Sequence, residues 1–143
     1  MKSSKSRVIV DTGFLVALFD RSDKYHQAAV QWLKKFEGTL ISVPHVLAET
    51  GFFIGSDNTA KLADQIGRGW IVLHSPDPDA YFRIATLLRK YKDLDPDLTD
   101  VALVWLAEAT QINSIVTVDV TDFSTYRING KSKFELLPWQ SVE

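Results

Sequence analysis

The amino-acid sequence predicts an α/β fold with a mostly parallel central sheet of four to five strands and helices on both faces. Short apolar runs rich in β-branched residues alternate with helical patterns along the chain. The 143 residues suffice for one domain with a sizeable core, and no Gly/Ser/Pro stretch is long enough to be a linker. Such alternation is typical of a doubly wound sheet, so we expect residues 1–143 to form a single domain.

The expected strands are short and apolar. Residues 7–10 (RVIV) and 114–118 (SIVTV) are the most apolar, and each run leads into an aspartate. Continuous apolar runs of this length are typical of strands that are buried on both faces, as in a parallel sheet. In chain order the expected strands are residues 7–10, 40–43, 70–73, 114–118 and, as a marginal last strand, 134–137.

The expected helices lie between these strands. Residues 25–36 and 79–91 are amphipathic, because apolar side chains recur at helical spacing with lysines or arginines between them. Pro44 suits the first turn of a helix that Gly55 ends, and a weaker helical stretch follows. In chain order the expected helices are residues 25–36, 44–54, 59–66, 79–91 and 98–110.

The composition excludes several classes of protein. Cysteine is absent, which removes disulfide scaffolds, zinc ribbons and thiol nucleophiles and suits a reducing compartment. No apolar run approaches the roughly 18 residues that a membrane span requires. We therefore expect a cytoplasmic protein that has no membrane partner.

The acidic residues are mostly aspartate. With 16 basic and 18 acidic side chains the net charge is −2, which at face value argues against a nucleic-acid partner. Thirteen of the acids are Asp and only five are Glu. Because Asp competes with the hydrogen bonding of a helix backbone, this surplus points to helix caps, turns or ligands of a hard metal ion.

Two of these aspartates follow the two most apolar strands. Asp11 comes after residues 7–10, and Asp119 comes after residues 114–118. A single aspartate at a strand end often only starts a turn or caps a helix. Ligands of open parallel sheets, however, bind beyond the carboxyl ends of the strands, so two acids in this position favour a functional site.

Glu49 and Asp100 are two further candidates. Glu49 is the only carboxylate in residues 44–54, which contain no lysine or arginine, so it is not part of a charged outer face. Asp100 falls in the first turn of the last expected helix, where the helix dipole favours an acid without any further role.

Convergence of Asp11, Glu49, Asp100 and Asp119 would create strong mutual repulsion. Such a cluster requires either raised pKa values or a bound cation. All-oxygen ligands suit Mg²⁺ or Mn²⁺ rather than zinc or copper. Because such an ion can activate water and neutralise a phosphate oxygen, metal-dependent phosphodiester hydrolysis is the expected chemistry.

The four acids lie in segments that follow one another in a characteristic order. Two segments are Val8-Ile-Val-Asp-Thr-Gly-Phe-Leu-Val-Ala-Leu18 and Val43-Pro-His-Val-Leu-Ala-Glu49. The others are Leu98-Thr-Asp-Val-Ala-Leu-Val-Trp-Leu-Ala107 and Ile115-Val-Thr-Val-Asp119, which Asp122-Phe123 follows. Together they span most of the chain and resemble the PIN-domain nuclease family, in particular the small VapC-type toxins of toxin–antitoxin pairs.

The resemblance implies a Rossmann-like PIN domain with the sheet order 3-2-1-4-5. It also implies a metal-dependent endoribonuclease that acts on single-stranded or loop RNA, forms a homodimer and, as a toxin, is neutralised by a cognate antitoxin. The implied catalytic and metal-binding residues are Asp11, Glu49, Asp100 and Asp119, with Asp97 and Asp122 as additional metal candidates and Thr12 and Thr117 in support. Asp119 is favoured over Asp122 because it directly follows the expected strand.

One position departs from the family pattern, and it bears on the rival interpretations. Gly13 stands where a small polar residue is common in the family.

Asp11-Thr-Gly13 is also the triplet of aspartic proteases, but those proteins are all-β and would leave the other three acids unexplained. A phosphatase of the haloacid-dehalogenase class would need a second Asp in place of Gly13. The remaining alternative is a catalytically inactive PIN-like module that binds RNA or a protein; the four intact carboxylates favour an enzyme, since in a pure binder they would only repel phosphate.

Overall fold

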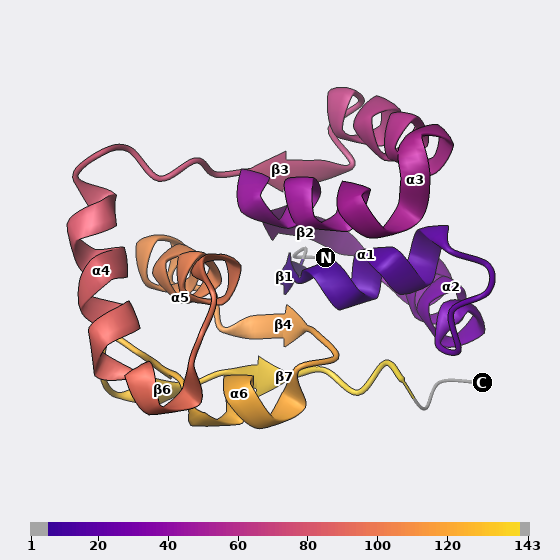
Figure 1. Cartoon of the computed structure of the whole chain (residues 1–143). Coiled ribbons are helices and arrows are strands. Elements are labelled where there is room, and N and C mark those ends of the chain that lie inside the picture. The colour runs from indigo at the N-terminus through magenta and orange to yellow at the C-terminus, as the bar shows by residue number, and fades with distance from the viewer. Residues whose placement is uncertain (1–5, 141–143) are drawn as a thin grey trace.

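Five parallel strands form the central sheet of the computed structural model (Figure 1), which describes residues 6–140. Their order is β3-β2-β1-β4-β7, so the order that the resemblance implies is confirmed. Ile9 in the central strand pairs with Ile41 on one side and with Ile115 on the other. The strands are β1 Ser6–Val10, β2 Gly38–Ser42, β3 Ile71–Leu73, β4 Ser114–Val116 and β7 Glu135–Leu136.

Helices cover both faces of this sheet. The chain moves outward from β1 to β3 and then returns past β1 to β4. Right-handed crossovers place the helices of the outward path and the helices of the return on opposite faces. Figure 1 shows α1 and α2 on one side of the central strands and α4 and α5 on the other. Across residues 6–140, no helix has both the length and the apolar character needed to cross a membrane. The helices are α1 Thr12–Phe19, α2 His26–Lys35, α3 Pro44–Gly67, α4 Ala80–Lys90, α5 Leu98–Thr110 and α6 Val120–Thr125, with a short 3₁₀ helix at Lys92–Leu94.

The strand that leads to Asp119 is shorter than predicted. The backbone N–H of Asp11 donates to the carbonyl of Val116 at 3.1 Å, and beyond this bond the first strand turns directly into α1. Strand β4 then has no ladder partner on this side, and it ends at Val116 instead of at residue 118. Asp119 therefore lies in a loop beyond the strand and does not follow the strand directly.

A kink at Gly55 joins the two helical segments predicted after β2. Helix α3 runs over both segments, but at Gly55 the backbone has φ +82° and ψ 166°. This left-handed conformation favours glycine, which has no Cβ. The helices predicted at residues 44–54 and 59–66 are both present and meet at this point.

Helices α1 and α6 and one hairpin were not among the predicted elements. Helix α1 is apolar along most of its length and lacks the amphipathic pattern of a surface helix. The hairpin consists of β5 (Arg127–Ile128) and β6 (Ser132–Lys133), joined through Asn129 and Gly130 with φ of 55° and 71°. Asn-Gly between two short runs is a recognised signal for a tight hairpin turn, so the sequence did contain the evidence for this element.

The C-terminal segment is anchored beneath the strand ends. Trp139 is fully buried, and its indole N–H donates to the backbone carbonyl of Thr117 at 3.1 Å. Its ring packs edge-on against Phe14, with centroids 4.9 Å apart, and against Tyr25, with centroids 5.7 Å apart. These contacts connect the end of the chain to the loop that carries Asp119 and to the segment before α2.

Candidate functional site

Asp11 lies at the carboxyl end of the central strand and caps α1. Its Oδ1 accepts from the backbone N–H of Thr12 at 2.7 Å, and its Oδ2 accepts from the hydroxyl of Thr117 at 2.7 Å. The Thr117 hydroxyl oxygen also accepts from the backbone N–H of Asp119 at 2.9 Å. Thr117 therefore holds the Asp11 carboxylate and the backbone of Asp119 in one arrangement.

Asp100 reaches the same place from the first turn of α5. Asp97 caps this helix, and its Oδ1 accepts from the backbone N–H of Asp100 at 2.8 Å. On its other side, Asp100 Oδ2 accepts from the hydroxyl of the fully buried Tyr126 at 3.2 Å. The helix cap and the tyrosine together fix the orientation of the Asp100 carboxylate.

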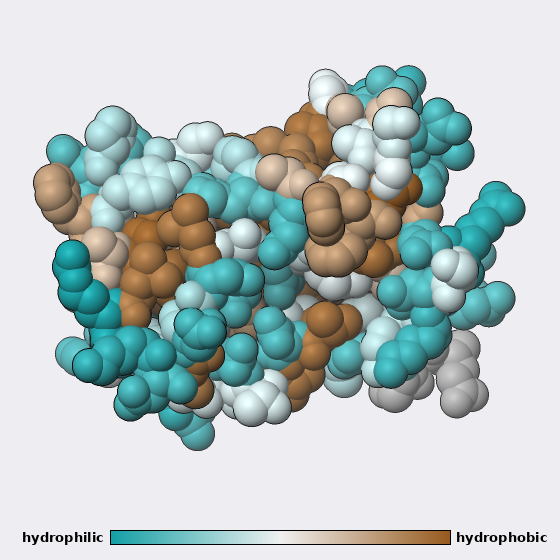
Figure 2. Space-filling model, viewed as in Figure 1, coloured by the Kyte–Doolittle hydropathy of each residue, from teal (hydrophilic) through white to brown (hydrophobic). Residues whose placement is uncertain are grey.

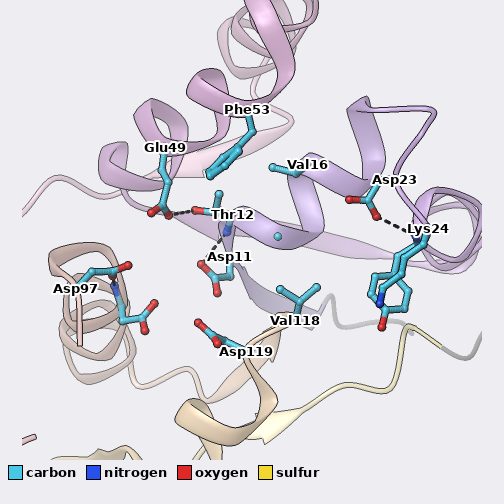
Figure 3. Close-up of a pocket in the computed structure, with 13 residues that line it drawn as sticks. Asp11, Thr12, Val16, Asp23, Lys24, Glu49, Phe53, Asp97, Val118 and Asp119 are labelled. Atoms are coloured by element: carbon cyan, nitrogen blue, oxygen red, sulfur yellow. Dashed lines mark hydrogen bonds between the residues drawn. The ribbon is translucent and has the colours of Figure 1, made fainter. Parts of the chain in front are cut away.

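Three carboxylates meet at the switch between the two halves of the sheet. Asp11, Asp100 and Asp119 each offer one oxygen, and these oxygens all lie within 4.8 Å of one another. Asp11 and Asp100 are only 4% and 6% exposed, whereas Asp119 is exposed. They line a pocket of about 390 Å³, and in Figure 3 the carboxylates of Asp11, Glu49 and Asp119 point toward a common space.

Glu49, Asp97 and Asp122 lie around this group of three. Glu49 Oε1 accepts from the Thr12 hydroxyl at 2.6 Å, and both Glu49 and Asp97 line the pocket. Asp122 is not among the lining residues, but its negative charge contributes to the raised pKa of Asp119. The predicted acids thus gather in one region, with Asp11, Asp100 and Asp119 closest together.

Burial and like charge disfavour ionisation of the three acids. Burial raises the pKa of Asp11 to about 6, against the opposing effect of its two hydrogen bonds. Burial, followed by the charges of Asp11, Asp97 and Asp119, raises the pKa of Asp100 to about 8. Burial also raises the pKa of Asp119. A divalent cation among these oxygens would remove the repulsion, so this all-carboxylate donor set fits a hard metal ion.

The side chain of Val118 fills the space beside Gly13 and leaves no room for a Cβ there. A Cβ at Gly13 would lie 2.3 Å from Val118 Cγ2 and 3.2 Å from Val118 Cβ. A larger residue at position 13 would therefore require Val118 to move. The Val118 side chain therefore fills the space that a side chain at position 13 would occupy.

The site also contains residues that were not predicted. Tyr126 was missed because its only sequence signal is an aromatic residue after a short helix, far along the chain from Asp100. Lys24, Tyr25 and Phe53 line the same pocket. The last two resemble ordinary core residues in a helical pattern, and only the folded chain shows that they border the pocket.

Comparison with known proteins agrees with this fold. Residues 8–128 match the family described as PIN domain. Ribonuclease VapC26 of Mycobacterium tuberculosis (strain ATCC 25618 / H37Rv) is 28% identical over 136 residues, which cover 92% of this chain and 100% of that protein.

Two solved structures resemble the chain in fold. Mycobacterium tuberculosis VapC20, described as a sarcin-ricin loop cleaving toxin, superposes with a TM-score of 0.70 at 18% identity, over 76% of this chain and 86% of that one. A toxin–antitoxin complex from Klebsiella pneumoniae gives 0.62 at 18% identity, over 82% and 91%.

The fold and the site define a doubly wound α/β domain. At the topological switch point of its sheet lies an acidic pocket whose carboxylates could hold a metal ion. The match over residues 8–128 covers most of the chain and identifies the particular family. The chain belongs to the PIN domain family.

Proposed function

We propose that this chain is a metal-dependent endoribonuclease that hydrolyses phosphodiester bonds in single-stranded or loop RNA, and that it is the toxin of a toxin–antitoxin pair. The observation that carries the proposal is the convergence of Asp11, Asp100 and Asp119 within 4.8 Å. The full-length similarity to a protein named as a ribonuclease supports the same activity. An inactive RNA-binding module is disfavoured, because uncompensated carboxylates would repel the RNA backbone.

The proposed cofactor is Mg²⁺ or Mn²⁺. Asp11, Asp100 and Asp119 are the proposed ligands, and Glu49, Asp97 and Asp122 surround them with further negative charge. When bound, such an ion would neutralise charge on a phosphate oxygen and make a water molecule more acidic.

Different side chains of the pocket are proposed to hold the metal ion and to accept a proton. Asp11 and Asp100 are buried and held by hydrogen bonds from Thr117 and Tyr126, so they serve as fixed ligands. Asp119 is exposed, so a water molecule can reach it, which suits a group that accepts the proton of the attacking water. Glu49, held by Thr12 at the edge of the pocket, is the second candidate for this proton.

The partners and the setting belong to the same proposal. We assign residues 1–143 to one domain that acts in the cytoplasm on an RNA substrate and is neutralised by an antitoxin. The solved structure from Klebsiella pneumoniae, which has a similar fold and is described as a toxin–antitoxin complex, supports an antitoxin partner. We also propose a homodimer: Phe82 on α4 is 78% exposed beside the half-exposed Tyr81, which leaves apolar surface for a second copy to cover.

The activity is tested with purified protein and a panel of structured RNAs. In Mg²⁺ or Mn²⁺, we expect cuts within loops or single-stranded segments, mapped by sequencing the RNA ends. EDTA should stop the cutting, and an excess of Mn²⁺ should restore it. If every RNA stays intact with either ion, the proposed function is wrong.

Removal of the Thr117 hydroxyl should weaken the site without unfolding the chain. Thr117→Val keeps the shape of the side chain but deprives Asp11 of a donor and the Asp119 N–H of its acceptor. Because such supporting partners orient metal ligands, we expect RNA cleavage to fall about 10- to 100-fold. Thr125→Val is the matched control, since its exposed hydroxyl bonds only within α6, and it should cleave like the wild type. Equal rates for the two variants would contradict the supporting role of Thr117.

A further inference from the structure

The pocket extends well beyond the carboxylates. Figure 3 shows Asp97, Glu49 and Asp119 toward one end, Lys24 and Asp23 at the other, and Phe53, Val16 and Val118 between them. Among the described residues that line the pocket, Lys24 is the only basic one. The proposed chemistry uses the acidic end alone and leaves the apolar middle and the lysine without a role.

A hydrogen-bonded loop holds the backbone around Lys24 in place. Asp20 Oδ1 accepts from the backbone N–H and the hydroxyl of Ser22, at 2.9 and 2.6 Å. Asp23 Oδ1 accepts from the backbone N–H of Tyr25 at 2.8 Å, and the Tyr25 ring rests on the buried Trp139. The Lys24 ammonium lies 5.0 Å from the centroid of the Tyr25 ring. The cation is thus presented at the pocket from a fixed backbone.

The middle of the pocket exposes apolar surface that the core does not use. Phe53 is 60% exposed and Val118 is 42% exposed, and both line the pocket. Phe52 meets the Phe53 ring edge-on at 5.3 Å between centroids, which supports the position of that ring. Figure 2 shows hydrophobic side chains over α3, and hydrophilic side chains lie next to them near the centre of the same view. An exposed aromatic face beside charged groups suits a nucleobase, which stacks on such rings with little regard to sequence.

We propose, on the basis of the proposed function, that the pocket holds one nucleotide adjacent to the cleaved phosphate, with its base against Phe53 and its other phosphate on the Lys24 ammonium. The cleaved phosphate lies at the acidic end, where cations compensate the carboxylates. The neighbouring phosphate has no such ion and meets Lys24, the single positive charge among the described lining residues. The adjacent carboxylate of Asp23 also lines the pocket, but its Oδ1 already accepts from the backbone N–H of Tyr25. Lys24 and Phe53 are positioning residues that select single-stranded RNA, because an unpaired base is free to turn onto the ring.

Steady-state cleavage of a loop RNA at several salt concentrations tests this assignment. For Lys24→Ala we expect KM to rise about 10-fold, because one phosphate contact is lost, with kcat nearly unchanged. The slope of log(1/KM) against log salt concentration should shrink by about 0.7, the value for one phosphate of a single strand. Lys24→Arg should recover most of the loss. Phe53→Ala should also raise KM about 10-fold but leave the salt slope unchanged, and Phe53→Trp should restore binding. Lys61→Ala, which removes the same charge from an exposed site on α3 outside the pocket, is the control.

The outcomes separate this inference from the function on which it rests. If the wild type cleaves RNA and Lys24→Ala has the KM and salt slope of Lys61→Ala, the inference is wrong and the nuclease stands. The same holds if Lys24→Ala lowers only kcat, or weakens only the capture of an antitoxin. If the wild type cleaves no RNA in either ion, both the function and the inference fall.

Discussion

Asp11→Asn is expected to lower RNA cleavage more than about 100-fold while the protein remains folded. Asparagine keeps the size of the side chain and one carbonyl oxygen, so the N–H of Thr12 retains its acceptor. The variant loses one negative charge from the three oxygens that lie within 4.8 Å of one another. Loss of a supporting partner of a metal ligand already costs about 10- to 100-fold, and loss of a ligand itself should cost more. The measurement is the initial rate of cleavage of a loop RNA in Mn²⁺.

The control for this experiment is Asp64→Asn, which removes the same charge from an exposed position on α3. It should cleave RNA at the wild-type rate. Circular dichroism and melting of Asp11→Asn establish that the fold is retained. Equal activity of Asp11→Asn and Asp64→Asn would exclude Asp11 from the site.

Asp100→Asn is expected to make the metal-free protein more stable at pH 8 and to abolish its stabilisation by metal. The folded-state pKa values of Asp100 and Asp11, about 8 and about 6, lie above the ordinary value of 3.8. The folded state therefore binds more protons than the unfolded state, and its stability falls as the pH rises from about 4 through these pKa values. For Asp11 alone this amounts to about 3 kcal/mol.

The expected result is a metal-free wild type whose melting temperature drops by roughly 10–20 °C between pH 5 and pH 8. Asp100→Asn has no charge to bury at this position, and its amide oxygen can still accept from Tyr126, so the drop should be much smaller. At pH 8, saturating Mn²⁺ at about 100 times its Kd should stabilise the wild type by about 2.7 kcal/mol and leave Asp100→Asn unchanged.

Three measurements would contradict this account. The first is a metal-free wild type that is more stable at pH 8 than at pH 5. The second is an Asp100→Asn variant with the same pH dependence as the wild type. The third is Mn²⁺ stabilisation of Asp100→Asn equal to that of the wild type, which would exclude this aspartate as a ligand. The third result concerns the metal alone and leaves the origin of the pH dependence intact.

Local patterns were enough to predict most of the fold. A strand such as residues 7–10 and a helix such as 98–110 depend on neighbouring residues, and the structure has both. The alternation of strands and helices then predicts a parallel sheet, and the carboxyl ends of the strands are where ligands of such sheets generally bind. The N-terminal helix was missed because a nearly all-apolar run carries no helical period, and the hairpin was missed although Asn129-Gly130 indicated it.

The details of the site could not be predicted in this way. Asp100 and Tyr126 meet only because α5 and the segment after α6 pack together, and no local pattern records that contact. The early end of β4, which places Asp119 in a loop, follows from the turn of the neighbouring strand into α1. Lys24 reaches the pocket on a loop whose tyrosine rests on Trp139, a residue from the other end of the chain.

The sequence by itself therefore determined the α/β architecture, the sheet and the set of acids, because these depend on periodicity and on residues close together in the chain. The tertiary structure decided which acids share one site and how strongly burial raises their pKa values. It also decided that a lysine and an exposed phenylalanine border the same pocket. Distances between residues far apart in the chain set desolvation and charge interaction, and only the packing of helices against the sheet fixes those distances.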